Sequence, residues 1–281
     1  MKRFLLLSML CLVLNGINAQ LLLNESFNGL GTGDLPGKGT PVWLPFTTTG
    51  SNPNPLLQTT TPLTYAGYNA GGGAEYVSIF QKTGSVQGGR STYKYFSQSV
   101  ALNTGAAPTN TFYYSFLVRV TEANQIADQA NYSVALRRAD GTSESESVGR
   151  FVISKETGAN GKWRFGLAAG STQTFAATTK TSNSPSDVYL ILIRYDMIAN
   201  NSDVAYMWIN PSLAAEPSLA SADATSTTGQ NGFGDRIDCL MILQRDTDRR
   251  PAADFDGFKV AVGTTSAAAF ASLGTQIPQP V

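Results

Sequence analysis

The stretch TFYYSFLVRVT, residues Thr111–Thr121, decides how this chain folds, because large apolar residues alternate along it with other residues. The apolar set is Phe112, Tyr114, Phe116, Val118 and Val120. The positions between them include Tyr113, Ser115 and Arg119. Successive side chains of a β-strand point to opposite faces of the sheet. The pattern therefore predicts an antiparallel strand with one buried face and one more polar face.

The same alternation recurs along the chain between clusters of Gly, Pro, Asn and Ser, and no segment has a sustained helical period. We therefore expect an all-β protein. Val188–Ile193 is apolar on both faces, which predicts a strand at the centre of a sheet, covered on both sides. The further strands that the pattern predicts are Leu21–Phe27, Ala74–Gln81, Thr92–Leu102, Tyr132–Arg138, Arg150–Lys155, Lys162–Ala168, Val188–Tyr195, Val204–Asn210, Arg236–Gln244 and Phe255–Val262.

Three junctions between predicted strands contain residues suited to tight turns. Asp140-Gly141 follows the strand that ends at Arg138, and Asn160-Gly161 precedes the strand that begins at Lys162. Both dipeptides tolerate the positive φ that tight hairpins need. The run Asn200–Asp203 has the same role before the strand at Val204. These junctions predict a meander of adjacent antiparallel strands.

Five stretches carry a resemblance to a known fold. LLNESFNG (Leu22–Gly29) resembles the opening strand of concanavalin A-like jelly rolls, the laminin-G-like and laminarinase-type β-sandwiches, and ADFDGFKVAVGTT (Ala253–Thr265) resembles their closing strand. Between them, YYSFLVRVT (Tyr113–Thr121), GRFVISKE (Gly149–Glu156) and VYLILIRYD…DVAYMWINP (Val188–Pro211) look like inner strands of laminin-G-like domains in secreted proteins of Bacteroidetes and related bacteria. The resemblance implies an antiparallel two-sheet β-sandwich of the concanavalin A-like jelly-roll type, with the first and last strands as sheet neighbours.

Several kinds of catalysis are excluded by what the sequence lacks. It has no histidine, which excludes Ser-His-Asp and Cys-His catalysis and metal sites built on histidine. Laminarinase-type hydrolases carry Glu-x-Asp-x-x-Glu on one strand as their catalytic carboxylates, and this spacing does not occur here. Cys239 lies in the apolar stretch Ile237–Leu243, which indicates a buried, unreactive thiol rather than a nucleophile. We therefore assign no catalytic residue.

The N-terminus has the pattern of a secretory signal. Lys2 and Arg3 precede the apolar run Phe4–Leu14, and Ala19 is placed as the last residue before cleavage. We expect residues 1–19 to be a signal peptide and residues 20–281 to form a single jelly-roll domain, secreted or held at the cell surface. A membrane span needs about 20 apolar residues, more than this run contains. Without Lys2 and Arg3 the net charge is −2, which does not suggest a protein that binds polyanions such as nucleic acid.

Aromatic side chains and one arginine are the candidate ligand-binding residues. Flat rings exposed on a sheet can stack on sugar rings, and Trp163, Tyr206 and Trp208 lie on predicted strands. The alternative is that these three rings fill the core of the sandwich, which their alternation with apolar neighbours favours. Tyr113 and Arg119 share the more polar face of their strand, which is more typical of a binding surface than of a core.

A structural calcium site is implied by the resemblance. In that fold a cation often joins the first strand to the last through an acidic side chain from each, and Glu25 and Asp256 occupy the matching positions. Calcium takes six to eight oxygen ligands, and Asn28, Gly29 and Gly31 are placed to add carbonyl oxygens. The alternative is that Glu25 and Asp256 only cap strand ends in solvent.

Taken together, the sequence predicts a secreted, non-catalytic binding or adhesion module without a membrane span. An extracellular or cell-surface polysaccharide is the partner that the resemblance implies. Two alternatives stay open: a polysaccharide hydrolase or lyase of the same fold, and a structural protein that assembles at the cell surface. Glycan binding predicts exposed aromatic rings on a sheet face, an enzyme predicts a cleft with two carboxylates or a Tyr–Arg pair, and assembly predicts a large apolar surface patch.

Overall fold

The computed structural model describes residues 19–46, 53–80, 89–101, 110–122, 131–138, 146–155, 162–182, 184–198, 202–229, 236–244 and 251–274. The predicted signal peptide, except for Ala19, lies outside these ranges. The predicted turn residues Asp140-Gly141 and Asn160-Gly161 also lie outside them.

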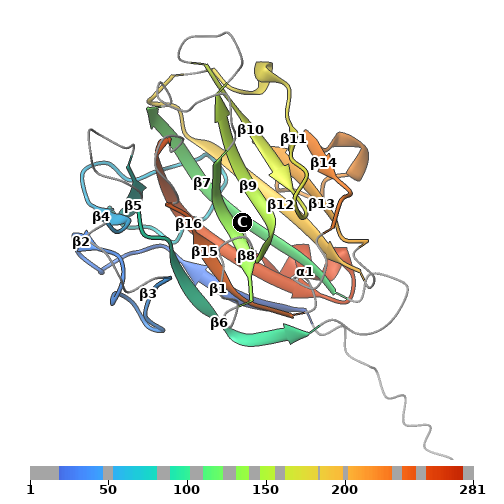
Figure 1. The fold of residues 1–281 in the computed structure, drawn as a ribbon, viewed down its shortest axis with the longest axis horizontal. Coiled ribbons are helices and arrows are strands. Elements are labelled where there is room, and N and C mark those ends of the chain that lie inside the picture. Colours follow the sequence, from blue (N-terminus) through green and yellow to red (C-terminus); the bar gives the residue numbers. More distant parts are fainter. Residues whose placement is uncertain are drawn as a thin grey trace, which may run out of the picture.

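The first of two antiparallel sheets contains both the first and the last strand, β1 and β16 (Figure 1). Its strand order is β14-β13-β12-β7-β16-β5-β4-β2, and β1 also pairs with β16. The strands of this first sheet are β1 (Gln20–Glu25), β2 (Gly33–Asp34), β4 (Leu56–Gln58), β5 (Tyr76–Ile79), β7 (Asn110–Glu122), β12 (Tyr189–Met197), β13 (Val204–Ile209), β14 (Ala224–Ser226) and β16 (Ala252–Gly263).

The second sheet packs against the first and has the order β11-β10-β9-β8-β15-β6-β3. Its strands are β3 (Leu44–Pro45), β6 (Thr92–Ala101), β8 (Asn131–Arg137), β9 (Ser147–Lys155), β10 (Trp163–Ala168), β11 (Thr174–Phe175) and β15 (Arg236–Ile242). Two short 3-10 helices, Thr178–Lys180 and Leu219–Ser221, and helix α1 (Ser266–Ser272) lie outside the sheets. Within the described ranges, none of the helices has the length and apolar character that crossing a membrane requires.

The core lies between the two sheets and is dominated by aromatic rings. The apolar set of β7 that alternation predicted faces this core and is fully buried. Phe116 on β7 packs edge-on against Phe151 of the second sheet, with ring centroids 5.1 Å apart, and stacks on Phe258 of β16 at 5.2 Å. Aromatic rings from both sheets therefore interlock, as expected where two sheets pack face to face.

The expected all-β sandwich is confirmed. Each of the eleven strands predicted from alternation overlaps a strand of the structure. The first and last strands pair, with Glu25 opposite Phe258, as the jelly-roll resemblance implies. The predicted meander is present as the pairings of β8 with β9, β9 with β10 and β12 with β13. Strand β12 lies between β7 and β13 and is buried on both faces, as its apolar sequence predicts.

Helix α1 was not expected from the sequence, because its seven residues are too few to show a helical period. The Thr265 side chain accepts a hydrogen bond from the Ala268 N–H and so caps its first turn. The helix packs on the outer face of the first sheet, where Ala269 and Leu273 contact a cluster that includes Tyr113 and Leu192. Tyr113 is fully buried there, so the face that alternation predicted as more polar is closed at this point.

A buried ion pair links the two sheets. The Lys94 ammonium on β6 donates to Glu25 Oε2 on β1 at 2.5 Å, and both side chains are at least nine-tenths buried. Glu25 also accepts hydrogen bonds from Trp43 Nε1 at 3.1 Å and from the Phe27 N–H at 2.9 Å. Burial of a charge is costly unless it is paired and hydrogen-bonded, and here three donors satisfy the carboxylate.

We expect the Lys94→Met variant to lose about 3–5 kcal/mol of unfolding free energy, because it leaves the Glu25 carboxylate charged and buried without its partner. Chemical denaturation at pH 7 measures this loss. The double variant Lys94→Met with Glu25→Gln removes both charges and should recover most of it. Equal instability of the single and double variants would show that the ion pair is not the cause.

Candidate functional site

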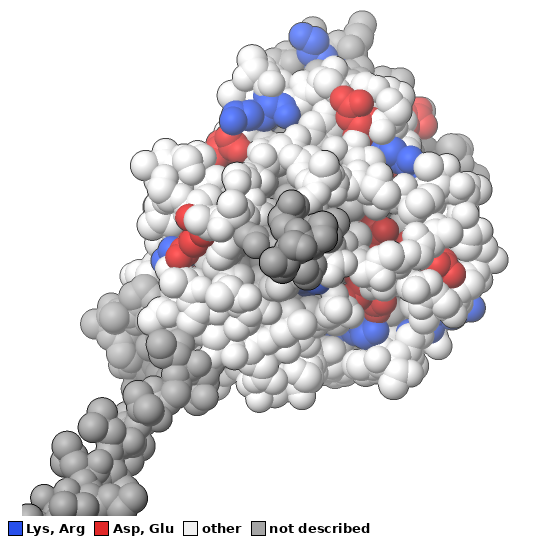
Figure 2. Space-filling view, turned by 180° about the vertical axis from the view of Figure 1, so that it is seen from behind, with Lys and Arg blue, Asp and Glu red and all other residues white. Residues whose placement is uncertain are grey.

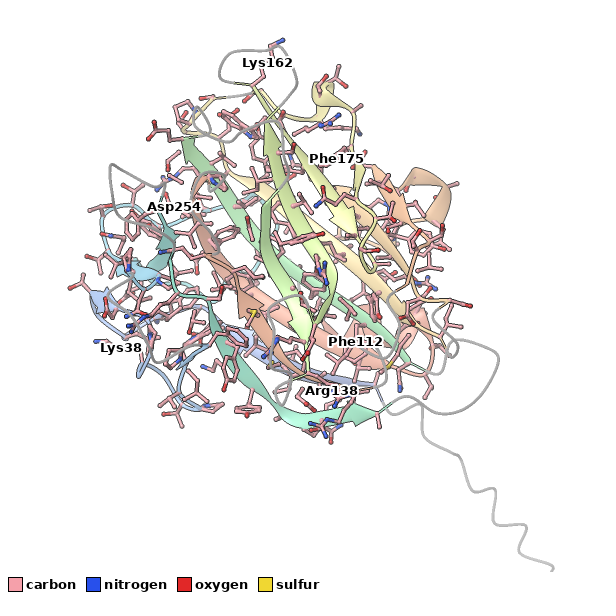
Figure 3. The ribbon with its side chains drawn as sticks, in the orientation of Figure 1. Lys38, Phe112, Arg138, Lys162, Phe175 and Asp254 are labelled. Carbon is pink, nitrogen blue, oxygen red and sulfur yellow. The ribbon has the colours of Figure 1, made fainter. Side chains whose placement is uncertain are left out.

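Two aromatic rings lie side by side on the outer face of the second sheet. Gly166 on β10 and Tyr132 on β8 both pair with Val152 on β9. The Phe175 ring covers Gly166, where an added Cβ would lie 2.5 Å from Phe175 Cδ1. Because neighbouring strands are about 4.8 Å apart, the backbone positions of Tyr132 and Gly166 are about 10 Å apart, with Val152 between them. Figure 3 shows Phe175 beside strands β10 and β11.

Each of three rings on this face lies against an arginine side chain. The distances from the guanidinium carbon to the ring centroid are 4.3 Å for Arg137 and Phe46, 4.5 Å for Arg150 and Tyr132, and 4.1 Å for Arg164 and Phe175. Such distances are typical of cation–π contacts. The three rings are partly exposed. Contact with an arginine therefore restricts the orientation of each ring, while part of each ring stays open to solvent.

Two tyrosines of β6 extend the aromatic surface. Tyr93 packs with Phe46 and Tyr132 on an apolar floor of Ala135, Met241 and Leu243. The rings of Tyr93 and Tyr95 are 5.5 Å apart in an edge-on arrangement, and Tyr95 is 40% exposed. We call this surface the aromatic face and define it by Phe46, Tyr93, Tyr95, Tyr132 and Phe175.

The thiol on this side of the second sheet is not reactive. Cys239 pairs with Tyr95 on one side and with Arg137 on the other. Its Sγ donates to the Arg137 carbonyl oxygen at 3.4 Å, and burial raises the pKa of the thiol to about 12. A thiol that stays protonated at neutral pH is a poor nucleophile. The chemistry that the aromatic face offers is therefore stacking and hydrogen bonding.

The sequence-predicted residues Tyr206 and Trp208 lie on the opposite side of the molecule, on the outer face of the first sheet. Their rings stack with centroids 6.3 Å apart, and Tyr113 stacks on Trp208 at 6.5 Å. Trp208 is 2% exposed, and its Nε1 donates to the Ser218 carbonyl at 3.3 Å and to Ser221 Oγ at 3.2 Å. Only Tyr206 of these three rings is partly exposed.

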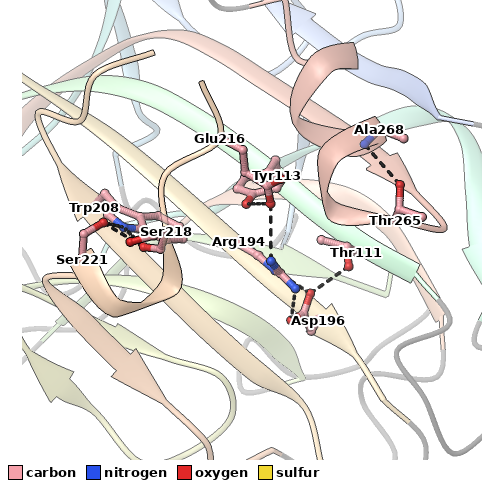
Figure 4. A network of polar contacts seen from close by, with 10 residues as sticks. All are labelled: Thr111, Tyr113, Arg194, Asp196, Trp208, Glu216, Ser218, Ser221, Thr265 and Ala268. Carbon is pink, nitrogen blue, oxygen red and sulfur yellow. Dashed lines mark hydrogen bonds and ion pairs between the residues drawn. The ribbon is translucent and has the colours of Figure 1, made fainter. Parts of the chain in front are cut away.

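A polar network surrounds Tyr113 (Figure 4). The Tyr113 hydroxyl donates to Glu216 Oε1 at 2.8 Å, and Arg194 Nη1 lies 3.5 Å from the same oxygen. Arg194 Nε and Nη2 each donate to a carboxylate oxygen of Asp196 at 2.8 Å, and Thr111 Oγ1 donates to Asp196 Oδ1 at 2.8 Å. The network holds the segment that contains Glu216 against the first sheet.

The Tyr–Arg pair that the enzyme alternative requires is present in this network, since Tyr113 and Arg194 are direct partners on β7 and β12. Burial, and then the hydrogen bond to Glu216, raise the pKa of Tyr113 well above its ordinary value. A general base must instead be able to lose its proton near neutral pH. Tyr113 is therefore a permanent hydrogen-bond donor here and a poor base.

The remaining two predicted ligand-binding residues have structural partners. Arg119 Nε and Nη2 donate to Asp254 Oδ2 at 3.0 and 2.7 Å, and its guanidinium lies 5.4 Å from the centroid of the Tyr76 ring. Trp163 is 3% exposed and belongs to the core between the sheets, which is the alternative considered for it. Neither residue joins the aromatic face.

The two predicted calcium ligands differ in their surroundings. Glu25 is buried in its ion pair with Lys94, as described above. Asp256 instead lines a cavity of about 420 Å³ together with Leu63, Tyr65 and Tyr68. Burial raises the pKa of Asp256 to about 8, and the negative charges of Glu25 and Glu75 add to this rise.

The fit of this region to calcium rests on Asp256. Both oxygens of Glu25 already accept hydrogen bonds, so Glu25 offers no free carboxylate. Over the described ranges, no group of three or more Asp, Glu, Cys or His side chains is arranged to hold a metal. Calcium binding therefore stays a prediction. Of the two predicted ligands, Glu25 and Asp256, only Asp256 has a carboxylate free to bind the ion.

Sequence analysis did not identify Phe46, Tyr132, Phe175 or the arginines beneath them. A signal existed for part of the set, because Arg150 and Arg164 lie on predicted strands at positions that alternate with apolar residues. Phe46 directly follows β3, and Phe175 is the last residue of β11; both strands have two residues, which is too short to show alternation.

Figure 2 shows one face of the molecule on which basic and acidic side chains are scattered singly and in both signs. A nucleic-acid-binding surface has clustered Lys and Arg. This face therefore offers no broad basic surface to a polyanion.

No family model matches the chain, and no curated protein matches it. Similar solved structures include the Trypanosoma cruzi (T. cruzi) calreticulin globular domain, with 10% identity, a TM-score of 0.48, and coverage of 90% of this chain and 91% of that chain. The alginate lyase Aly36B has 10% identity and a TM-score of 0.48, with coverage of 89% and 97%. A lectin from Bauhinia forficata in complex with GalNAc has 10% identity and a TM-score of 0.40, with coverage of 80% and 99%. The activities in these names belong to those proteins.

The raised pKa of Asp256 predicts a pH-dependent stability. A carboxyl with a folded-state pKa of about 8 and an ordinary unfolded pKa near 4 holds its proton more tightly when folded, so stability falls as the pH rises through this window. The Asp256→Asn variant should not lose stability in this way, because its amide does not ionise in this pH range. We expect it to melt at a higher temperature than the original protein at pH 9, with a difference that shrinks toward pH 4. Thermal melts in chelator measure this, and a difference independent of pH would contradict it.

Calcium, if bound through Asp256, should raise the melting temperature of the original protein. A ligand that binds only the folded state stabilises it by about 2.7 kcal/mol at 100 times its dissociation constant. Asp256→Asn should remove the rise, because an amide does not supply the charge that calcium prefers. Identical melting temperatures in chelator and in millimolar calcium would refute the prediction.

Proposed function

We propose that this protein is an extracellular, non-catalytic module that binds glycans through the aromatic face. The observation that carries the proposal is the arrangement of Phe46, Tyr132 and Phe175, three partly exposed rings that are each held against an arginine on one side of one sheet. Aromatic rings provide a large flat contact area at a small cost in conformational entropy.

The geometry of the rings favours a ligand of repeated units. The backbone positions of Tyr132 and of Gly166, which the Phe175 ring covers, are about 10 Å apart. Tyr93 and Tyr95 continue the surface across the sheet. A ligand that stacks on several rings in a row must itself present several flat, weakly polar faces. Sugar rings in a chain have such faces, formed by C–H groups, with hydroxyl groups at their edges to meet the polar atoms nearby.

Support for binding rather than catalysis comes from the groups able to transfer protons. Burial raises the pKa values of Tyr113 and Cys239 away from neutrality, and the Tyr113–Arg194 pair lies on the outer face of the other sheet, under helix α1.

Export is the part of the proposal that rests on the N-terminal pattern. We place the mature N-terminus at Gln20, the first residue of β1. Sequencing the N-terminus of exported protein tests this, and recovery of exported protein that retains Met1–Ala19 would refute it.

The test of glycan binding is a glycan-array screen of the mature protein, followed by calorimetry with the best ligand. We expect Tyr132→Ala and Phe175→Ala each to weaken binding by about tenfold, a loss of about 1.4 kcal/mol, because each removes one stacking ring. Tyr206→Ala is the matched control, since Tyr206 is also a partly exposed ring but lies on the other sheet.

Equal losses for all three variants would place the binding site elsewhere. No binding to any glycan on the array would refute the proposed function. Reducing-end or unsaturated-product release from the bound glycan would instead favour the enzyme alternative.

A further inference from the structure

One arginine of the aromatic face differs from the other two. Arg150 Nε donates to the Ser147 carbonyl at 2.7 Å, and both Arg137 and Arg150 take part in further interactions. Arg164 Nε is buried without a hydrogen-bond partner, as are Nε and Nη1 of Arg137. Unlike Arg137, Arg164 is partly exposed, and its guanidinium has no hydrogen bond or ion pair among the described residues. Buried donors are rarely left unpaired in folded proteins, so the unpaired Nε of a partly exposed arginine requires an explanation.

The position of Arg164 suggests what that explanation is. Arg164 pairs with Ser154 across β9 and β10, and its guanidinium lies 4.1 Å from the centroid of the Phe175 ring. Gly166, two residues along the same strand, leaves the space in which this ring sits. Stacking on the ring fixes the plane of the guanidinium, and the N–H groups at the edge of that plane stay free to donate.

We infer that the glycan bound on the aromatic face carries acid groups and that Arg164 binds one of them beside the Phe175 ring. The inference rests on the proposed function and names the class of ligand. A planar guanidinium donates two parallel hydrogen bonds to a carboxylate or to a sulfate group. The acid group is therefore the carboxylate of a uronic acid or a sulfate ester, which share this geometry.

The overall charge does not reveal this preference. Basic and acidic residues are equal in number in the full sequence, so general attraction to polyanions is weak. Recognition then depends on one oriented ion pair next to a stacked sugar. It should distinguish acidic from neutral sugars while showing a shallow dependence on salt, because few counterions are released when one charge is paired.

The experiment compares acidic with neutral polymers, including one pair that differs only in the charge of its carboxyl groups. Calorimetry at pH 7 measures binding of alginate and of the same polymer after reduction of its carboxyl groups, together with a sulfated galactan and the neutral glucan laminarin. We expect at least one acidic polymer to bind about tenfold more tightly than its neutral counterparts, equivalent to about 1.4 kcal/mol. Binding of the sulfated polymer alone would identify the acid group as sulfate, and binding of alginate alone would identify it as carboxylate.

Variants assign the effect to Arg164. Arg164→Gln should reduce binding of the acidic polymer to about the level of its neutral counterpart, a larger factor than any loss it causes on neutral polymers through the Phe175 ring. Lys38→Gln, which removes a positive charge at another site, should change neither. Gly166→Ala provides a second probe, because its added methyl group displaces the Phe175 ring on which Arg164 stacks. It should weaken the acidic preference even if Arg164→Gln does not fold.

The outcomes separate the inference from the proposed function. Equal binding of the acidic and neutral polymers refutes the inference and leaves glycan binding standing. An acidic preference that survives both Arg164→Gln and Gly166→Ala also refutes it. Absence of binding to all four polymers and to the glycan array refutes both.

Discussion

The pairing of β16 along both of its edges is the constraint on which the rest of the structure depends. One edge pairs with β7, and the other pairs with β5 and then with β1. A bulge at Gly257, whose φ is +62°, lies where the partner of β16 changes from β5 to β1. A larger residue does not fit there, because an added Cβ would lie 2.8 Å from Ala70 Cβ. The Tyr68 hydroxyl donates to the Gly257 carbonyl, so the loop that lines the Asp256 cavity is anchored at the bulge.

The two outer faces of the sandwich differ in how far other parts of the chain cover them. On the first sheet, α1 and the segment around Glu216 cover Tyr113 and Trp208, so large aromatic residues serve the fold there. On the second sheet, rings such as Tyr132 and Phe175 stay partly exposed and rest on arginines. An aromatic residue on a strand can thus be part of a second core or part of a binding surface, and the difference depends on what covers it.

The buried carboxylates of Glu25 and Asp256 differ in their partners. Glu25 is paired with Lys94 and accepts two more hydrogen bonds, so its carboxylate is fully satisfied although it is buried. Asp256 accepts a hydrogen bond from the Gly257 N–H but faces no described cation, and its pKa rises to about 8. Two carboxylates on neighbouring strands, which look equivalent in the sequence, therefore have different surroundings.

The sequence by itself determined the all-β class, the approximate bounds of eleven strands and the pairing of the first strand with the last, because alternation is local and the end motifs resemble a known fold. It also indicated that Cys239 is inert. Only the tertiary structure decided that Tyr113 and Trp208 are covered, since α1 comes from more than 50 residues further along the chain than Trp208. The aromatic face likewise depends on cross-strand register, which places Phe175 over Gly166 and Arg150 against Tyr132. Those contacts join residues on different strands, and the alternation within one strand does not record them.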